Sequence, residues 1–138
     1  MKYDYLGTPQ SDSRRPWRWR PWLEVEFATR DGKKAKTVGL VDSGADEILL
    51  DLPFTELLGV DIAKCEEGTT MGIGGQRQTF YRTTLSLTVL HGKPIEVPVC
   101  FTKLGVGCLL GQDGFFDQYR IRFERDHKSF ELVPVPRR

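Results

Sequence analysis

The chain has 138 residues, of which 28% are charged and 39% hydrophobic, so it is long enough for one domain with its own core and too short for two. Its apolar stretches are only a few residues long, and no hydrophobic signal region opens it. We therefore expect a cytoplasmic protein without a membrane span. The formal net charge is only +1, which gives no reason to expect a nucleic-acid partner.

Residues 1–21 differ in composition from the remainder. They hold five basic and two acidic residues, a charge of +3, so the remainder carries −2. Their prolines and serines predict a flexible segment without regular structure ahead of a folded domain at 22–138. Within it, the run 14–22 mixes arginines with three tryptophans. This run could anchor the chain at an anionic membrane surface, but we favour a tail whose tryptophans fold back onto the domain.

Beyond residue 21, short strands follow one another. Leu23, Val25 and Phe27 alternate with more polar residues, the period-two pattern of a half-buried strand. The dipeptide Asp31-Gly32 predicts a hairpin turn into a second strand. Further strands are predicted at 36–41, 80–90, 94–101, 120–124 and 129–133. Helix is scarce: 53–59 could form one or two turns, and 112–119 is the better candidate. The expected fold class is all-β, a barrel or a sandwich.

The three cysteines indicate no metal or thiol chemistry. Cys65, Cys100 and Cys108 form no CxxC pair, and the chain has only two histidines. Cys100 and Cys108 lie among apolar residues and are expected to be core thiols. This usage weakly favours a reducing compartment.

Three motifs stand in an informative order. First, the apolar strand 39–41 runs into Asp42-Ser43-Gly44 and Ala45. Second, a glycine-rich segment at 71–75 opens a hairpin. Third, the apolar run 108–110 ends at Gly111 and leads into the candidate helix.

Together these motifs resemble the retropepsin family of aspartic peptidases, over residues 23–133. The resemblance implies a closed, mostly antiparallel acid-peptidase barrel with one short helix. A pepsin-like chain needs two Asp-Ser/Thr-Gly motifs, whereas this chain has one. The resemblance therefore implies a homodimer in which each copy supplies Asp42.

The resemblance also implies a role for each matching residue. Asp42 is the expected catalytic carboxylate. Ser43 and Gly44 form the active-site loop, and the Ser43 hydroxyl is expected to bond across the dimer. Gly111 is the expected structural glycine beneath that loop. The expected substrate-binding residues comprise two beside the loop and a flexible flap: Ala45, Asp46, Met71, Gly72, Ile73, Gly74 and Gly75. In many viral members an Arg stands where this chain has Gln112, and it pairs with the acid at the position of Asp46. The replacement puts this brace around the loop in doubt.

The expected chemistry needs neither a cofactor nor a metal. Two adjacent carboxylates that share one proton, as in aspartic peptidases generally, supply both the base that deprotonates water and the acid that protonates the amide. The expected partner besides a second copy is an extended peptide, bound by strand-like main-chain hydrogen bonds.

Alternative interpretations were weighed against this one. Asp42 alone could be a turn residue. The glycines at 72–75 could form a phosphate loop, but no Lys-Ser/Thr follows. Ser43 lacks the flanking glycines of a hydrolase nucleophile. The acids between 42 and 51 lack the alternating pattern of a calcium loop. The remaining alternative is a catalytically inactive dimerisation or peptide-binding module of the same fold.

Overall fold

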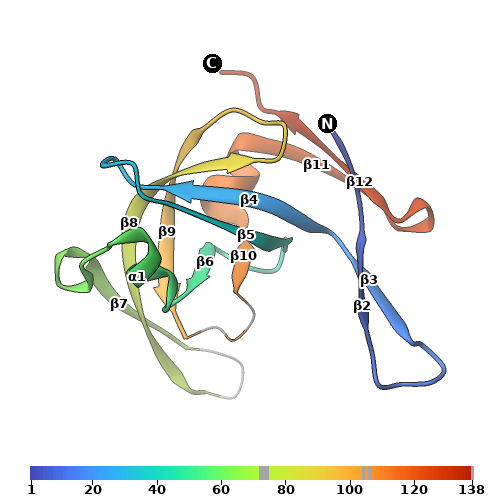
Figure 1. Cartoon of the computed structure of the whole chain (residues 1–138), viewed down its shortest axis with the longest axis horizontal. Coiled ribbons are helices and arrows are strands. Elements are labelled where there is room, and N and C mark those ends of the chain that lie inside the picture. Colours follow the sequence, from blue (N-terminus) through green and yellow to red (C-terminus); the bar gives the residue numbers. More distant parts are fainter. Residues whose placement is uncertain (72–74, 104, 106, 138) are drawn as a thin grey trace.

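In a computed structural model, which describes residues 1–71, 75–103, 105 and 107–137, most of the chain is β-strand (Figure 1). The strands, in chain order, are β1 (Lys2–Asp4), β2 (Leu6–Pro9), β3 (Trp17–Arg20), β4 (Trp22–Ala28), β5 (Lys34–Val41), β6 (Ile48–Asp51), β7 (Glu66–Met71), β8 (Arg77–Val89), β9 (Ile95–Thr102), β10 (Cys108–Leu110), β11 (Tyr119–Glu124) and β12 (Ser129–Pro134). They form a seven-stranded sheet, a three-stranded sheet and a two-stranded hairpin.

Six strands of the large sheet close into a barrel. Their order is β4-β5-β10-β6-β9-β8, and β8 pairs back onto β4. Two pairings, β5–β10 and β6–β9, are parallel, and the others are antiparallel. Strand β7 extends the sheet beyond the barrel as the partner of β8. The predicted closed, mostly antiparallel all-β barrel is confirmed.

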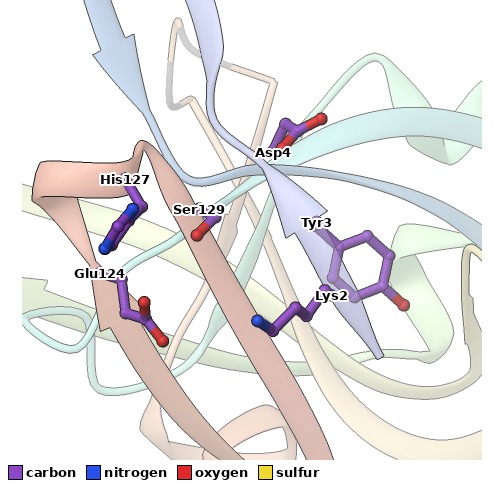
Figure 2. Close-up of a pocket in the computed structure, with 6 residues that line it drawn as sticks. All are labelled: Lys2, Tyr3, Asp4, Glu124, His127 and Ser129. Atoms are coloured by element: carbon purple, nitrogen blue, oxygen red, sulfur yellow. The ribbon is translucent and has the colours of Figure 1, made fainter.

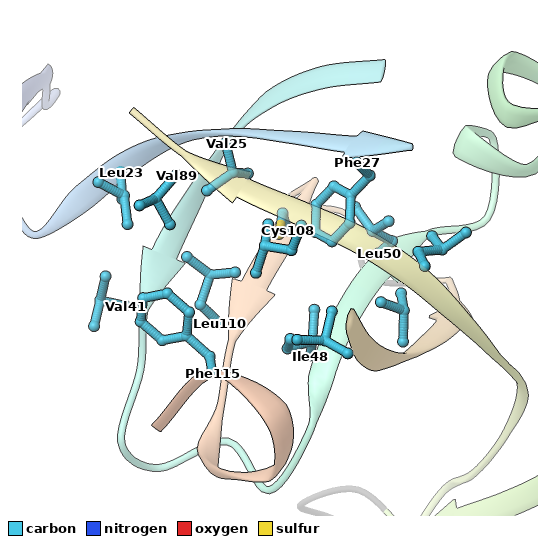
Figure 3. Close-up of a cluster of buried hydrophobic side chains, with 14 of the residues drawn as sticks. Leu23, Val25, Phe27, Val41, Ile48, Leu50, Val89, Cys108, Leu110 and Phe115 are labelled. Atoms are coloured by element: carbon cyan, nitrogen blue, oxygen red, sulfur yellow. The ribbon is translucent and has the colours of Figure 1, made fainter. Parts of the chain in front are cut away.

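The alternating residues of the strands fill the barrel. Leu23, Val25 and Phe27 of β4 are at most 4% exposed, and Figure 3 shows them in one cluster with Leu110 and Phe115. Fully burying a side chain of this size stabilises the fold by about 1.5–3 kcal/mol. The packed barrel core therefore fixes the strand ends that carry the candidate site.

The predicted hairpin turns are confirmed. The Thr29 N–H donates to the Lys33 carbonyl at 2.9 Å, and Gly32 takes a φ of +88° between them, a conformation that glycine adopts without steric cost. His91 and Lys128 occupy left-handed positions, with φ of 64° and 51°, in the turns that follow β8 and precede β12.

The two helix predictions came out in the reverse order of preference. The regular helix is α1 (Phe54–Leu58), closed by Gly59 in a left-handed conformation. The favoured segment forms a helical turn at Gln112–Phe116 that is interrupted at Asp113 and Gly114. Gly114 has a φ of +90°, and its N–H donates to the Asp117 carboxylate at 3.0 Å, which breaks the helical ladder. Short 3₁₀ turns lie at Ile62–Lys64 and Arg125–His127. Among the described residues, no helix has the length and apolar character to cross a bilayer.

The prediction that residues 1–21 lack regular structure is wrong. Strand β1 pairs with β12 and forms a sheet in the order β1-β12-β11, while β2 and β3 pair with each other. Tyr3 and Tyr5 are buried against Phe130, with the Tyr3 and Phe130 rings stacked at 5.3 Å. The prolines lie at strand ends and in connections, where a missing N–H breaks no ladder. Proline content therefore misled the prediction for β1, where pairing with β12 and the burial of Tyr3 and Tyr5 offset the cost of ordering the chain.

Candidate active site

Asp42 lies directly after β5, where the chain leaves the barrel. Its backbone N–H still donates to the Leu110 carbonyl of β10 at 3.0 Å, continuing the parallel ladder in which Val41 pairs with Leu110. Because both strands are part of the closed barrel, the backbone position of Asp42 is fixed. Its side chain is half-buried, and the two residues after it are exposed.

The loop after Asp42 folds around the carboxylate itself. The Gly44 N–H donates to Asp42 Oδ1 at 2.9 Å, and the Ala45 N–H donates to the Asp42 carbonyl at 3.2 Å. A Cβ atom on Gly44 would lie 3.2 Å from Asp42 Oδ1, tighter than an ordinary contact. The Asp-Ser-Gly sequence thus forms a turn that fixes one carboxylate oxygen and leaves the loop open to solvent.

The segment after β10 supports this loop from beneath. Gln112 N–H donates to the Ala45 carbonyl at 2.9 Å, and Asp113 N–H donates to the Asp46 carbonyl at 2.8 Å. A Cβ atom on Gly111 would lie 2.5 Å from the Ala45 oxygen and still closer to the Glu47 oxygen. Only glycine lets the two backbones approach so closely.

Gln112 takes part in the brace that the sequence left in doubt. Its side-chain Nε2 donates to the Ser43 carbonyl at 2.8 Å. Together with the two backbone bonds, this contact ties the segment 43–46 to 112–113. The Gln112 amide therefore holds the loop at the position where the sequence resemblance left the brace in doubt.

A cluster that the sequence did not reveal links the loop to the barrel wall. Arg82 pairs with the Glu47 carboxylate, whose other oxygen accepts from the Cys100 thiol at 2.8 Å. Glu66 lies 3.7 Å from Arg82 on the other side. Glu66, Arg82 and Cys100 are directly opposite one another across β7, β8 and β9. Burial, and then the Glu47 carboxylate, raise the pKa of the Cys100 thiol to about 12, so this thiol is a hydrogen-bond donor and not a nucleophile.

The structure places the ends of the predicted flap. Met71 ends β7 and pairs with Arg77 at the start of β8, and Gly75 is exposed between the two strands. Gly72, Ile73 and Gly74 lie outside the described residues. Strands β7 and β8, which border the segment predicted as a flap, are antiparallel partners and extend past the barrel (Figure 1).

Outside the Asp42 loop, the part of the chain that the structure describes holds hollows but no metal-ligating group. The described residues contain no group of three His, Cys, Asp or Glu side chains that could hold a metal ion. Figure 2 shows a hollow on the three-stranded sheet, whose lining does not include Asp42: it is formed by Lys2, Tyr3, Asp4, Glu124, His127 and Ser129. Its two acids lie on β1 and β11, with β12 between them, so they form no adjacent carboxylate pair.

Solved structures share this architecture. A retropepsin-like aspartic protease from Rickettsia conorii is 20% identical, with a TM-score of 0.59 over 81% of this chain and 88% of its own. The retroviral protease-like domain of Ddi1 from Leishmania major is 18% identical, with a TM-score of 0.54 over 83% and 92%. The EIAV protease, solved with the inhibitor HBY-793, is 20% identical, with a TM-score of 0.53 over 67% and 82%. No protein-family model and no curated protein sequence matches the chain. The chain has a retropepsin-like fold.

Proposed function

We propose that the protein is an aspartic endopeptidase whose active site forms between two copies of the chain, each supplying Asp42. The observation that carries this proposal is the loop at 42–44, which follows a barrel strand and is supported by Gly111 and Gln112. The loop stands in a barrel of retropepsin-like fold. In a single chain the carboxylate is partly open to solvent, so a second copy can approach it.

The pairing of two carboxylates supplies the chemistry. Two acids this close share one proton, so one is ionised and the other is protonated. The ionised carboxylate takes a proton from water as the water oxygen bonds to the peptide carbon, and the protonated one gives its proton to the carbonyl oxygen. The resulting tetrahedral intermediate returns its hydroxyl proton to a carboxylate, the C–N bond breaks, and the other carboxyl protonates the amine.

The remaining predicted residues would serve the substrate. An extended peptide would lie between the copies, with Ala45 and Asp46 beside its main chain and the segment 71–75 above it. Closure of that segment would exclude water and orient the scissile bond. The exposed position of Asp46 and the β7–β8 hairpin support this arrangement.

Asp42→Asn tests the proposal directly. The purified chain is incubated with a mixed peptide library at several pH values, with and without a pepstatin-type inhibitor, and new termini are counted by mass spectrometry. We expect inhibitor-sensitive cleavage that disappears in Asp42→Asn, because an amide cannot share the proton. Asp126→Asn, at an exposed turn, is the matched control and should cleave normally.

Two results would contradict the proposal. Unchanged cleavage by Asp42→Asn would exclude the aspartic mechanism. If the wild-type chain is folded and dimeric but cleaves nothing in the library, the protein is an inactive binding module of the same fold.

A further inference from the structure

The β2–β3 hairpin with its connection, residues 6–20, is named here the arm, and it stands away from the barrel (Figure 1). At its base the arm contacts the body through Trp19, which packs against the core. There the Arg125 guanidinium donates to the Trp19 carbonyl at 3.1 Å, and Lys128 Nζ lies 4.7 Å from the centre of the Trp19 ring. A lone two-stranded hairpin is marginally stable in water. The arm therefore needs a further surface to be well ordered.

The arm has two chemically different faces. Residues directly opposite each other in a ladder share a face, so Trp17 and Trp19 of β3 lie on one side with Pro9 and Gly7 of β2. Trp17 is 54% exposed, and its ring centre lies 6.3 Å from that of Trp19. Arg18 and Arg20 of β3 lie on the other side. Exposed tryptophan beside arginine is the composition of protein interface hot spots.

The arm and the segment that begins at Asp42 carry opposite net charges. The arm holds four arginines and one acid, a charge of +3. Residues 42–67 hold eight acids and one lysine, a charge of −7. The exposed members of that stretch include Glu56 of α1 and Glu67 of β7, and the exposed Leu57 lies beside Glu56. The two segments are complementary in charge, and each exposes a large apolar side chain.

We propose that the arm docks on a second copy of this chain, against the acidic stretch 42–67. In Figure 1 the end of β5, which Asp42 follows, points toward the side from which the arm projects, while α1 and β7 lie on the other side of the barrel. A copy that approaches Asp42 from that side meets the arm. The four paired residues alone extend the arm by about 13 Å at a strand rise of ~3.3 Å per residue.

A membrane surface suits the arm less well. Interfacial segments place basic side chains so that they reach lipid headgroups while the aromatic side chains insert. Here Trp17 and Arg18 are neighbours on one strand and point to opposite faces. Inserting the tryptophans would direct Arg18 and Arg20 away from the headgroups. A protein partner can contact both faces of a projecting hairpin.

This inference rests on the proposed pairing of two copies, and its test measures association and not cleavage. Three variants are compared by sedimentation velocity over a concentration series at low and high salt. Arg15→Glu with Arg18→Glu reverses the net charge of the arm from +3 to −1; this variant is called the reversed arm. Arg30→Glu with Lys93→Glu makes the same change in charge at exposed positions elsewhere. Glu56→Lys with Glu67→Lys reverses the charge of two exposed residues of the acidic stretch and changes the net charge of the stretch from −7 to −3; it is tested alone and combined with the reversed arm.

We expect the reversed arm to weaken the dimer about ten-fold at low salt and less at high salt, because interface charge pairs are screened. The control should change the dissociation constant by less than about two-fold. Glu56→Lys with Glu67→Lys should weaken the dimer when alone and should regain affinity when combined with the reversed arm, because the exchanged charges are again opposite at these two positions. Circular dichroism confirms that each variant is folded.

Each contrary result overturns the inference in a distinguishable way. A wild-type chain that stays monomeric at every concentration refutes the pairing and the docking together. A dimer unaffected by the reversed arm refutes the docking alone and leaves the pairing intact. If the combined variant does not regain dimer affinity, the acidic stretch is not the docking surface. Binding to phosphatidylserine vesicles that the reversed arm abolishes, with dimerisation unchanged, assigns the arm to a membrane instead.

Discussion

Gly111 shows how one residue controls the geometry of the loop. A methyl group there would collide with the backbone oxygens of Ala45 and Glu47, which belong to the loop and cannot rotate away. We expect Gly111→Ala to destabilise the fold by about 2–3 kcal/mol, within the range of overpacking, and to displace the loop at Asp42. Denaturant unfolding measures the loss.

Gly39→Ala is the control for Gly111→Ala. Its Cβ would meet only the side chains of Leu110 and Cys108, at 2.9 and 3.0 Å. These side chains can shift, so the cost should be clearly smaller than at Gly111. Equal losses at the two positions would show that the loop does not depend on the close approach of its backbone to Gly111.

Cys100 predicts a pH dependence of stability. Its pKa is raised from 9.0 to about 12 in the folded chain, so the native state keeps a proton that the unfolded state releases. This contribution is fully present below pH 9 and is lost as the pH rises toward 12. In Cys100→Ser the hydroxyl can still donate to Glu47 but does not titrate. We expect the unfolding free energy of the variant to fall less steeply over this range.

Cys65→Ser provides the comparison for Cys100→Ser. Cys65 is only half-buried, although burial and Asp61 also raise its pKa. Its replacement should change the pH slope less than replacement of Cys100. Identical slopes in the wild type and Cys100→Ser between pH 9 and 12 would contradict the buried, Glu47-bonded position of that thiol.

Sequence analysis could single out residues whose contacts are local in the chain. Asp42 and Gly44 form a turn through contacts two residues apart, and a glycine after an apolar strand marks Gly111. The Glu47, Arg82 and Cys100 cluster was missed because its members are 35 and 53 residues apart. Only the strand register brings them together, and nothing in the local pattern of β8 or β9 indicates that pairing.

At the scale of elements, Arg82 connects β8 to the segment that follows the Asp42 loop. It lies in β8 and reaches Glu47, in the segment just before β6. Among the residues that the structure describes, its loss would leave the Cys100 thiol as the only partner of the Glu47 carboxylate. We expect Arg82→Ala to lower the unfolding free energy by about 1–2 kcal/mol, in line with a hydrogen bond to a charged group. Denaturant titration measures this change.

Arg122→Ala is the matched control for Arg82→Ala. Arg122 also lies near two acids, Glu124 and Glu131, but its side chain is 64% exposed against 32% for Arg82. Exposed pairs contribute little, so we expect a change within about 0.5 kcal/mol. A loss at Arg122 as large as that at Arg82 would mean that the Arg82 cluster has no special role.

Element boundaries show where local sequence rules were overridden. Period-two alternation located β4 and β8, in which buried residues alternate with less buried ones, and the turns between strands located their neighbours. The N-terminal strands were missed because proline counts ignore the partner strand: β1 is held by pairing with β12 and by Tyr3 and Tyr5 against Phe130. The helical turn after Gly111 is broken by Gly114, where an added Cβ atom would lie within 3.4 Å of Pro98, Ile48 and Val97.

At the scale of the whole molecule, one chain carries half of the proposed site. The barrel confirms the fold expected from three motifs in order, since the strands that carry them meet in one sheet. A single Asp-Ser-Gly loop, open to solvent at Ser43 and Gly44, is consistent with a site that a second copy completes. The count of motifs made this requirement visible in the sequence, whereas the surfaces that join two copies depend on the folded shape.

The claim that two chains share one site is tested most directly by mixing. Wild-type chain at fixed concentration receives increasing Asp42→Asn chain, after subunit exchange has been demonstrated with two mass-labelled forms, and peptide cleavage is measured. A mixed dimer has half a carboxylate pair and should be inactive. Random pairing then predicts about half the original activity with an equal amount of mutant and about a tenth with a nine-fold excess. Activity that stays constant under mutant excess would show that each chain carries a complete site, contrary to this account.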